Sequence, residues 1–157
     1  MKKLGVLVCT NAAIDYIPHE YDVRVIRSMI LMGGKEYIDY EELTANQFYE
    51  MLESDPSLFP RTSMASTGTM LEAYEKLRDE GCDEALFVTI SSKMSGIYEN
   101  ALIAAKMVEG IKVTVFDSKT VGYLQCKMAF TAHEMAKAGK SMDEIIDDLV
   151  AGRVVST

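Results

Sequence analysis

The chain has 157 residues, of which 48% are hydrophobic, and its 24 acidic and 16 basic side chains give a formal net charge of −8. This length and apolar content suit one globular domain with its own core and exclude a disordered chain. The acidic balance argues against nucleic acid or an anionic membrane surface as the main partner. An anionic ligand would therefore have to be held by local hydrogen-bond donors.

No apolar run reaches the length of a transmembrane span, and no membrane span is expected. The apolar residues 4–10 lead into a polar segment without a convincing cleavage site, which indicates a first buried strand instead of a signal peptide. The three cysteines, Cys9, Cys82 and Cys126, lie far apart in the sequence and form no C-x-x-C motif. This pattern predicts a reduced protein in the cytoplasm.

Strand-like and helix-like segments alternate along most of the chain. Strands are expected at residues 4–10, 23–32, 85–90 and 113–116, with a short extended return at 35–39 after the turn Gly33-Gly34. Helices are expected from Thr44, over residues 66–81, 95–109 and 122–138, and after Ser141. Thr44 with Gln47 and Ser141 with Glu144 have the spacing of capping boxes. The alternation predicts an α/β fold with a parallel sheet and helices on both faces.

Two hydroxyl-rich stretches precede predicted helices. The first is Arg-Thr-Ser-Met-Ala-Ser-Thr-Gly-Thr at residues 61–69, and the second is Ser-Ser-Lys-Met-Ser-Gly-Ile-Tyr at residues 91–98. Backbone N–H groups of a first helical turn lack partners within the helix, and nearby hydroxyls add further donors. We expect the two stretches to meet in space and to bind one acidic group. Asp117-Ser118 also follows a predicted strand, where sheets of this kind bind ligands, although a simple strand-end turn explains it equally well.

Four patches resemble the N-terminal domain of the DegV family of fatty-acid-binding proteins. They are Gly-Gly-Lys-Glu-Tyr-Ile-Asp at residues 33–39, Arg-Thr-Ser-Met-Ala-Ser at 61–66, Ser-Ser-Lys-Met-Ser-Gly-Ile-Tyr-Glu-Asn-Ala at 91–101 and Val-Phe-Asp-Ser-Lys at 115–119. The chain departs from the family pattern at Thr10-Asn11-Ala12, where the family usually has Thr-Asp-Ser. The patches occur in the family's order and span nearly the whole chain.

The resemblance implies a Rossmann-like three-layer domain over residues 1–157, with the family's second domain absent from the chain. It implies a long-chain fatty acid such as palmitate as ligand, with the carboxylate held by Thr62 and Ser95. Ser63, Ser92 and Gly96 are expected to support the site, since a glycine lets a ligand approach the backbone closely. Family members of the better-understood kind present the fatty acid to a separate fatty acid kinase. The chain is thus expected to be a carrier and not an enzyme, with no cofactor and no metal.

Other interpretations stay open beside this one. Serines and threonines before a helix are most often caps, which is the expected role of Ser66 and Thr67. The chain could instead be a stand-alone anion-binding or interaction domain that self-associates through the surface that would meet the missing domain. A serine hydrolase using Ser95 is a third interpretation. It lacks a G-x-S-x-G motif, and His19 and His133 are isolated in the sequence.

Overall fold

The computed structural model describes residues 3–156 of the chain, with side chains described up to residue 152. The fold comprises two compact units. Residues 1–26 together with 66–157 form one, called here the main unit, and residues 27–65 form the other, called the small unit. Each unit has its own core of buried side chains.

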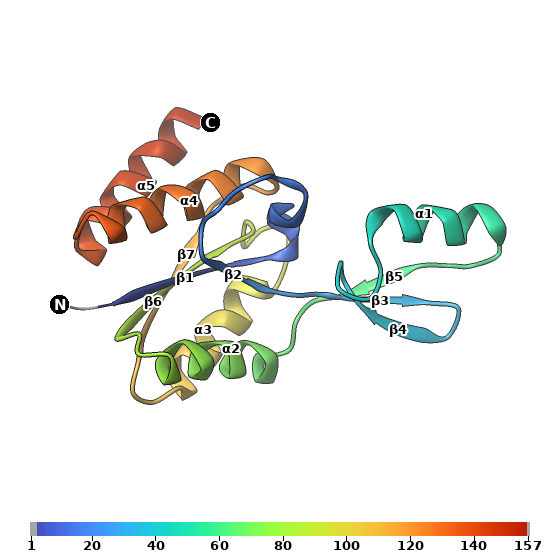
Figure 1. Ribbon diagram of the computed structural model, residues 1–157, viewed down its shortest axis with the longest axis horizontal. Helices are drawn as coiled ribbons and strands as arrows, with labels where there is room; N and C mark the ends of the chain where they lie inside the picture. The colour runs from blue at the N-terminus through green and yellow to red at the C-terminus, as the bar shows by residue number, and fades with distance from the viewer. Residues whose placement is uncertain (1–2, 157) are drawn as a thin grey trace. The chain divides into compact units, whose positions relative to one another are not determined.

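The main unit is built on a four-stranded parallel sheet with strand order β2-β1-β6-β7. Its strands are β1 (Leu4–Cys9), β2 (Val23–Ile26), β6 (Glu84–Thr89) and β7 (Lys112–Asp117). Its helices are α2 (Thr67–Asp79), α3 (Ile97–Met107), α4 (Tyr123–Lys137) and α5 (Met142–Ser156), and two short 3-10 helices, η1 (Thr10–Ala12) and η2 (Ile14–Tyr16), follow β1. Helices α2 and α3 cover one face of the sheet, and α4 and α5 lie over the other (Figure 1). The predicted three-layer α/β fold is therefore confirmed.

The two central strands of this sheet are buried on both faces. In β1 and β6, every residue after the first is buried, including Val6, Val8 and Phe87. Strands covered by helices on both sides need such continuous apolar runs, which is why the sequence pattern identified them. Tyr74 of α2 is also fully buried, and its hydroxyl donates to the carbonyl oxygen of Ala101 at 3.1 Å, joining α2 to α3.

The small unit contains an antiparallel sheet with strand order β4-β3-β5 and one helix. Its elements are β3 (Met29–Met32), β4 (Lys35–Ile38), α1 (Ala45–Ser54) and β5 (Arg61–Ser63). Gly33 and Gly34 have φ values of 61° and 76°, as a two-residue hairpin turn requires between β3 and β4. Ile30, Met32 and Leu43 form the core of the unit, and Phe48, Met51 and Leu52 of α1 pack against it.

Two sequence-based predictions about this region are wrong. Residues 23–32 were expected to form one strand, but Arg27 and Ser28 separate β2 from β3. β2 pairs with β1 in the parallel sheet, whereas β3 pairs with β4 and β5 in the antiparallel one. The apolar run hides this break, because periodicity does not reveal which strand is the pairing partner. Residues 61–63, expected in a loop, form β5 at the edge of the small sheet.

The predicted capping residues of α1, α2 and α5 are confirmed, whereas α3, expected from Ser95, begins at Ile97. The Thr44 hydroxyl accepts from Gln47 N at 3.3 Å and the Gln47 amide oxygen accepts from Thr44 N at 2.9 Å, so the capping box of α1 is complete. Ser141 and Glu144 form the same reciprocal pair before α5. Ser66 caps α2 by accepting from Thr69 N. Within residues 3–156, no helix is both long and apolar enough to cross a bilayer.

Candidate functional site

The carboxyl edge of the main sheet is formed by the loops that follow β6 and β7. Hydrogen bonds join these two loops directly. Ser91 N donates to the carbonyl oxygen of Thr120 at 2.9 Å, and Ser118 N donates to that of Thr89 at 3.2 Å. Ser91 and Ser118 are both buried. The two polar sequences that follow the strands therefore form one connected structure at the edge where parallel sheets bind ligands.

The Asp117 carboxylate lies at the centre of this structure. Its Oδ2 accepts from the Ser92 hydroxyl at 2.6 Å, and its Oδ1 accepts from Ser92 N at 3.2 Å and from Lys119 N at 2.9 Å. The hydroxyl hydrogen of Ser92 is thereby directed at Asp117 and not at solvent. Lys119 has a positive φ of 57°, which the bond from its N–H to Asp117 helps to hold. Sequence reasoning left the role of Asp117 open, although its position at the end of a predicted strand was the available signal.

Ser95 lies in the same loop, just before α3. Its Oγ accepts from Ile97 N at 3.3 Å, and the side chain is partly exposed. Because the oxygen is the acceptor in this contact, the hydroxyl hydrogen is left to donate elsewhere. Gly96 is the N-cap residue of α3 and has no side chain to cover the first turn. The start of α3 thus offers a hydroxyl donor beside the N–H groups of a helix N-terminus.

Thr62 and Ser63 lie in the small unit, on β5. Thr62 is exposed and is the register partner of Ile30 in β3. Its hydroxyl makes no hydrogen bond to any residue between 3 and 156. Ser63 points to the opposite face of the strand, as alternate residues do, and its hydroxyl donates to the carbonyl oxygen of Met64 at 3.4 Å. A ligand bound on one face of β5 would therefore contact Thr62 or Ser63, but not both.

The predicted site residues therefore fall into two groups. Ser92, Ser95 and Gly96 lie together at the carboxyl edge of the main sheet, and Thr62 and Ser63 belong to the small unit. The convergence of the two groups on one ligand stays a prediction and is part of the function proposed below.

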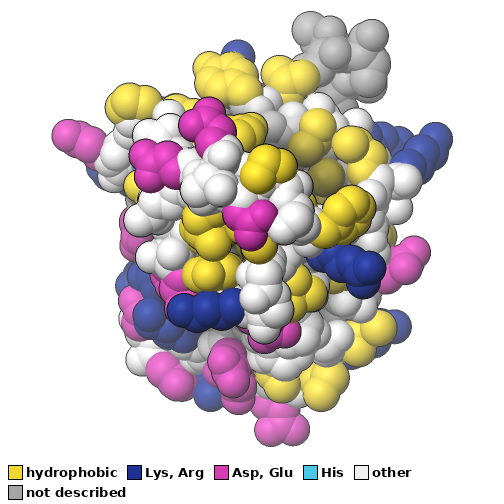
Figure 2. Space-filling model, turned by 90° about the vertical axis from the view of Figure 1, so that its right-hand side faces the viewer, with side chains coloured by type: hydrophobic (Ala, Val, Ile, Leu, Met, Phe, Trp, Pro, Cys, Tyr) yellow, Lys and Arg dark blue, Asp and Glu magenta, His cyan; other side chains and the backbone are white. Residues whose placement is uncertain are grey.

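Exposed apolar side chains accompany the polar groups at the carboxyl edge of the main sheet. They follow β1, β6 and β7 in turn: Tyr16, Met94, Val121, Tyr123 and Leu124. Tyr123 and Met94 are the most open of them, at 61% and 60% exposed. Figure 2 shows another view of the surface, on which hydrophobic side chains lie among acidic and basic ones. The carboxyl edge thus carries apolar surface close in sequence to the hydroxyl donors.

Gln125 is a buried polar residue that sequence reasoning missed. It lies on α4 against the sheet, where its Nε2 donates to Cys9 Sγ at 3.1 Å and to the Val88 carbonyl oxygen at 3.2 Å. Its Oε1 is buried and has no partner among the residues that the structure describes. Burial also raises the pKa of the Cys9 thiol. A polar residue at an inward helix position gives no sequence signal, because its face is known only once the helix is packed.

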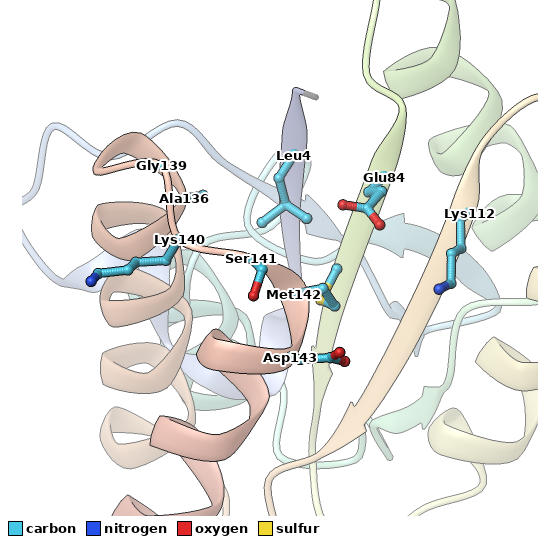
Figure 3. Close-up of a pocket in the computed structure, with 9 residues that line it drawn as sticks. All are labelled: Leu4, Glu84, Lys112, Ala136, Gly139, Lys140, Ser141, Met142 and Asp143. Carbon is cyan, nitrogen blue, oxygen red and sulfur yellow. The ribbon is translucent and has the colours of Figure 1, made fainter. Parts of the chain in front are cut away.

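A cavity of about 370 Å³ lies at the opposite edge of the main sheet, between the strand starts and the turn from α4 to α5 (Figure 3). It is lined by Leu4, Glu84, Lys112, Ala136, Gly139, Lys140, Ser141, Met142 and Asp143. The lining holds two lysines and two acidic residues, and Lys140 points away from Leu4 and Met142 (Figure 3). Ser141 is engaged with Glu144 in the α5 capping box. The polar side chains of this cavity therefore do not point towards a common position where an anion could bind.

Both histidines of the chain lie near the start of β2, at this same amino edge. The His19 and Phe130 rings lie tilted against each other with centroids 4.8 Å apart, and His133 forms an edge contact with Tyr21 at 5.7 Å between centroids. Ser95 lies at the carboxyl edge, so neither histidine is placed to act as its general base. Within the described part of the chain, no group of three His, Cys, Asp or Glu side chains is arranged to hold a metal ion.

The fold and the carboxyl-edge loops define a class of protein, an α/β domain with a polar site at the ends of its parallel strands. The family model described as "Uncharacterised protein, DegV family" matches residues 6–153 of this chain. A DegV domain-containing protein of Listeria monocytogenes is 31% identical over 135 residues, which cover 86% of this chain and 47% of that protein. One of Clostridium acetobutylicum is 31% identical over 150 residues, covering 95% and 52%. The chain belongs to the DegV family, as its sequence motifs predicted.

Solved structures agree with this assignment. DegV of Bacillus subtilis, described as a fatty acid binding protein, matches with a TM-score of 0.89 and 28% identity, over 98% of this chain and 54% of that one. A Thermotoga maritima protein, described as revealing a fatty acid binding function, matches with a TM-score of 0.84 and 28% identity, over 96% and 55%. The chain therefore spans about half the length of the curated relatives and of the solved proteins it matches.

Proposed function

We propose that this chain binds a long-chain fatty acid such as palmitate by its carboxylate. Thr62 and Ser95 are the hydroxyl donors in this proposal, and Ser63, Ser92 and Gly96 support them. The observation that carries it is the Ser95 hydroxyl, whose oxygen accepts from Ile97 N and whose hydrogen is left to donate at the start of α3. The description of the Bacillus subtilis and Thermotoga maritima relatives as fatty acid binding proteins supports the choice of ligand.

The two parts of a fatty acid make different demands on the protein. A buried acyl chain contributes about 0.8 kcal/mol per methylene, so a long chain offers on the order of 10 kcal/mol before binding costs. A helix N-terminus adds only about 0.3–1 kcal/mol towards an anion at an exposed site. Exposed side chains such as Met94 and Tyr123 offer apolar surface for the acyl chain at the carboxyl edge. Apolar surface should therefore set the strength of binding, and the hydroxyls should select the head group.

The resemblance to the better-understood DegV proteins also supports a role as carrier. In that role the chain holds the acyl group and presents the carboxyl end to a separate fatty acid kinase, and it performs no chemistry itself. A head group at the rim of the sheet, beside partly exposed Ser95, would be within reach of such a partner.

Lipid content tests the proposal directly. The protein is incubated with palmitate, freed of excess ligand, extracted with organic solvent and analysed by mass spectrometry. Wild type should retain palmitate. The double variant Thr62→Val with Ser95→Ala should retain at most about one tenth as much, because both hydroxyl donors to the charged head group are lost. Equal retention in the two proteins, or no retention by wild type, would contradict the proposal.

A matched double variant controls for general damage. Thr114→Val repeats the threonine-to-valine change at a position within β7, away from the proposed site. Ser141→Ala repeats the serine-to-alanine change at a helix-capping hydroxyl on the amino edge of the main sheet. Ser141→Ala should cost about 1 kcal/mol of stability, comparable to the loss of the Ser95 contact with Ile97 N. This control should retain palmitate as wild type does.

A further inference from the structure

The Asp117 side chain joins the loop that presents Ser95 to the neighbouring strand of the main sheet. Asp117 lies at the end of the neighbouring strand β7, and its carboxylate accepts hydrogen bonds from the hydroxyl and N–H of Ser92 and from Lys119 N. Ser92 in turn lies in the turn that leads to Ser95, closed by the bond from Met94 N to the Ser91 carbonyl oxygen at 2.9 Å. Asp117 thus connects the end of β7 to the turn before α3.

We propose that Asp117 is the positioning residue of the head-group site, fixing through Ser92 and Lys119 the turn that directs the Ser95 hydroxyl at the ligand. This inference rests on the proposed function and deepens it. Asp117 does not touch the ligand in this account, and neither does the Ser92 hydroxyl, whose hydrogen is donated to Asp117. The role is to keep the loop in one conformation before the ligand arrives, which lowers the entropy cost of binding.

The charge of Asp117 requires an explanation, because an uncommitted carboxylate would repel a carboxylate ligand. Its two oxygens are surrounded by donors at 2.6, 2.9 and 3.2 Å. Two of these donors are backbone N–H groups, which cannot rotate away. These neutral donors stabilise the carboxylate charge without removing it, and they occupy acceptor positions on both oxygens.

Other contacts keep the two loops in register without setting the turn itself. Ser118 Oγ donates to the Thr120 carbonyl oxygen at 3.2 Å, and Thr120 in turn accepts from Ser91 N. None of these contacts uses the Asp117 side chain. The variants below should therefore fold, and the loss should be confined to the order of the turn.

Head-group preference provides the test. Binding of palmitate and of its neutral methyl ester, which has the same acyl chain, is compared in wild type and variants. Asp117→Ala should lower the preference for the acid by about tenfold or more, the scale of one hydrogen bond to a charged group, with ester binding unchanged. Asp117→Asn keeps an oxygen for Ser92 N and Lys119 N and should restore most of the preference. Asp147→Ala, at an exposed position on α5, should behave as wild type.

The outcomes separate the two proposals. A wild type without preference for the acid overturns the proposed function, and with it the role of Asp117 in binding. If wild type prefers the acid and Asp117→Ala keeps the same preference, the positioning role of Asp117 is overturned and the proposed function is not. Amide hydrogen exchange in the unliganded protein gives a second measurement. Exchange at Ser92 and Lys119 should be faster in Asp117→Ala than in Asp147→Ala, and unchanged exchange would also overturn the positioning role.

Discussion

Gly5 of β1 and Leu77 of α2 are in such close contact that a Cβ atom placed on Gly5 would lie 2.9 Å from both Cδ atoms of Leu77. Leu77 is 2% exposed, so its side chain could move only by displacing buried neighbours. Gly5→Ala should therefore lower the free energy of unfolding by about 1–3 kcal/mol, the cost of overpacking a core. Leu77→Ala should cost about 2–5 kcal/mol.

The double variant distinguishes this packing effect from a general intolerance of change. The methyl group introduced by Gly5→Ala would fill part of the space vacated by Leu77→Ala, so the two losses should combine to less than their sum. Gly152→Ala, on α5 with nothing within 4 Å of the new Cβ, should instead stabilise the protein by up to about 1 kcal/mol. Urea unfolding measures the three single variants and the double variant against wild type. Additive losses, or a neutral Gly5→Ala, would contradict the prediction.

An ion-pair network at the edge of the main sheet predicts a pH dependence of stability. Arg24 of β2 donates to both oxygens of Glu80, at 2.6 and 2.7 Å, and to Asp22 at 2.9 Å. Hydrogen bonds from Arg24 lower the pKa of Glu80 from its ordinary 4.5 and that of Asp22 from 3.8. Groups with a pKa lowered by folding stabilise the protein above their unfolded pKa, and this stabilisation is lost as the pH falls through the folded values.

Arg24→Gln tests this sign. Wild type should be more stable than the variant at pH 7, and the difference should shrink as the pH falls below about 4.5, because both carboxyl groups are then protonated. Melting temperatures at pH 7, 5, 4 and 3 provide the measurement. Lys106→Gln, which removes a charge from an exposed position on α3, should show no such trend. A difference that stays constant over this pH range would rule out the network as its cause.

The three cysteines should be unreactive in the folded protein. Cys9, Cys82 and Cys126 are free thiols with at most 5% exposure. Burial raises the pKa of all three thiols, to about 11 for Cys126, so little reactive thiolate is present at neutral pH. A thiol reagent at pH 7.5 should label none of them within minutes and all three in urea. Rapid labelling of one cysteine without urea would be incompatible with this packing.

Ser92→Ala and Ser95→Ala should differ although the residues are three positions apart. Ser92→Ala removes the hydroxyl bond to Asp117 but keeps the bond from Ser92 N, so it should cost about 1 kcal/mol of stability and little of the preference for acid over ester. Ser95→Ala should remove most of that preference, because the donor itself is lost. An equal loss in both variants would contradict this difference in role between the two hydroxyls.

Features set by local sequence were predicted correctly. Thr44 and Ser141 cap helices because a capping box needs only residues three positions apart, and β6 is recognisable because both of its faces are buried. Features that depend on which strands pair with each other were not predicted correctly. The break at Arg27 follows from two strands joining different sheets, and the strand at 61–63 exists because β3 offers it an edge.

The site divides in the same way. The motifs led to the prediction of Ser95 as a ligand residue, which stays a prediction, and to the strand-end position of Asp117. The hydrogen bond from Ser92 to Asp117 joins residues 25 positions apart. A contact of this kind depends on the β6–β7 pairing and has no local signature in the sequence. Gln125 was missed for a similar reason, since its partners Cys9 and Val88 come from two different strands.

The central claim is that Thr62 and Ser95 hold the carboxylate of a fatty acid, and NMR of palmitate labelled with ¹³C at the carboxyl carbon tests it most directly. We predict a bound carboxyl resonance distinct from that of free palmitate. It should shift in Thr62→Val and in Ser95→Ala, and it should not shift in Thr114→Val or Ser141→Ala. A bound resonance that is identical in all five proteins, or no bound resonance in wild type, would contradict the claim.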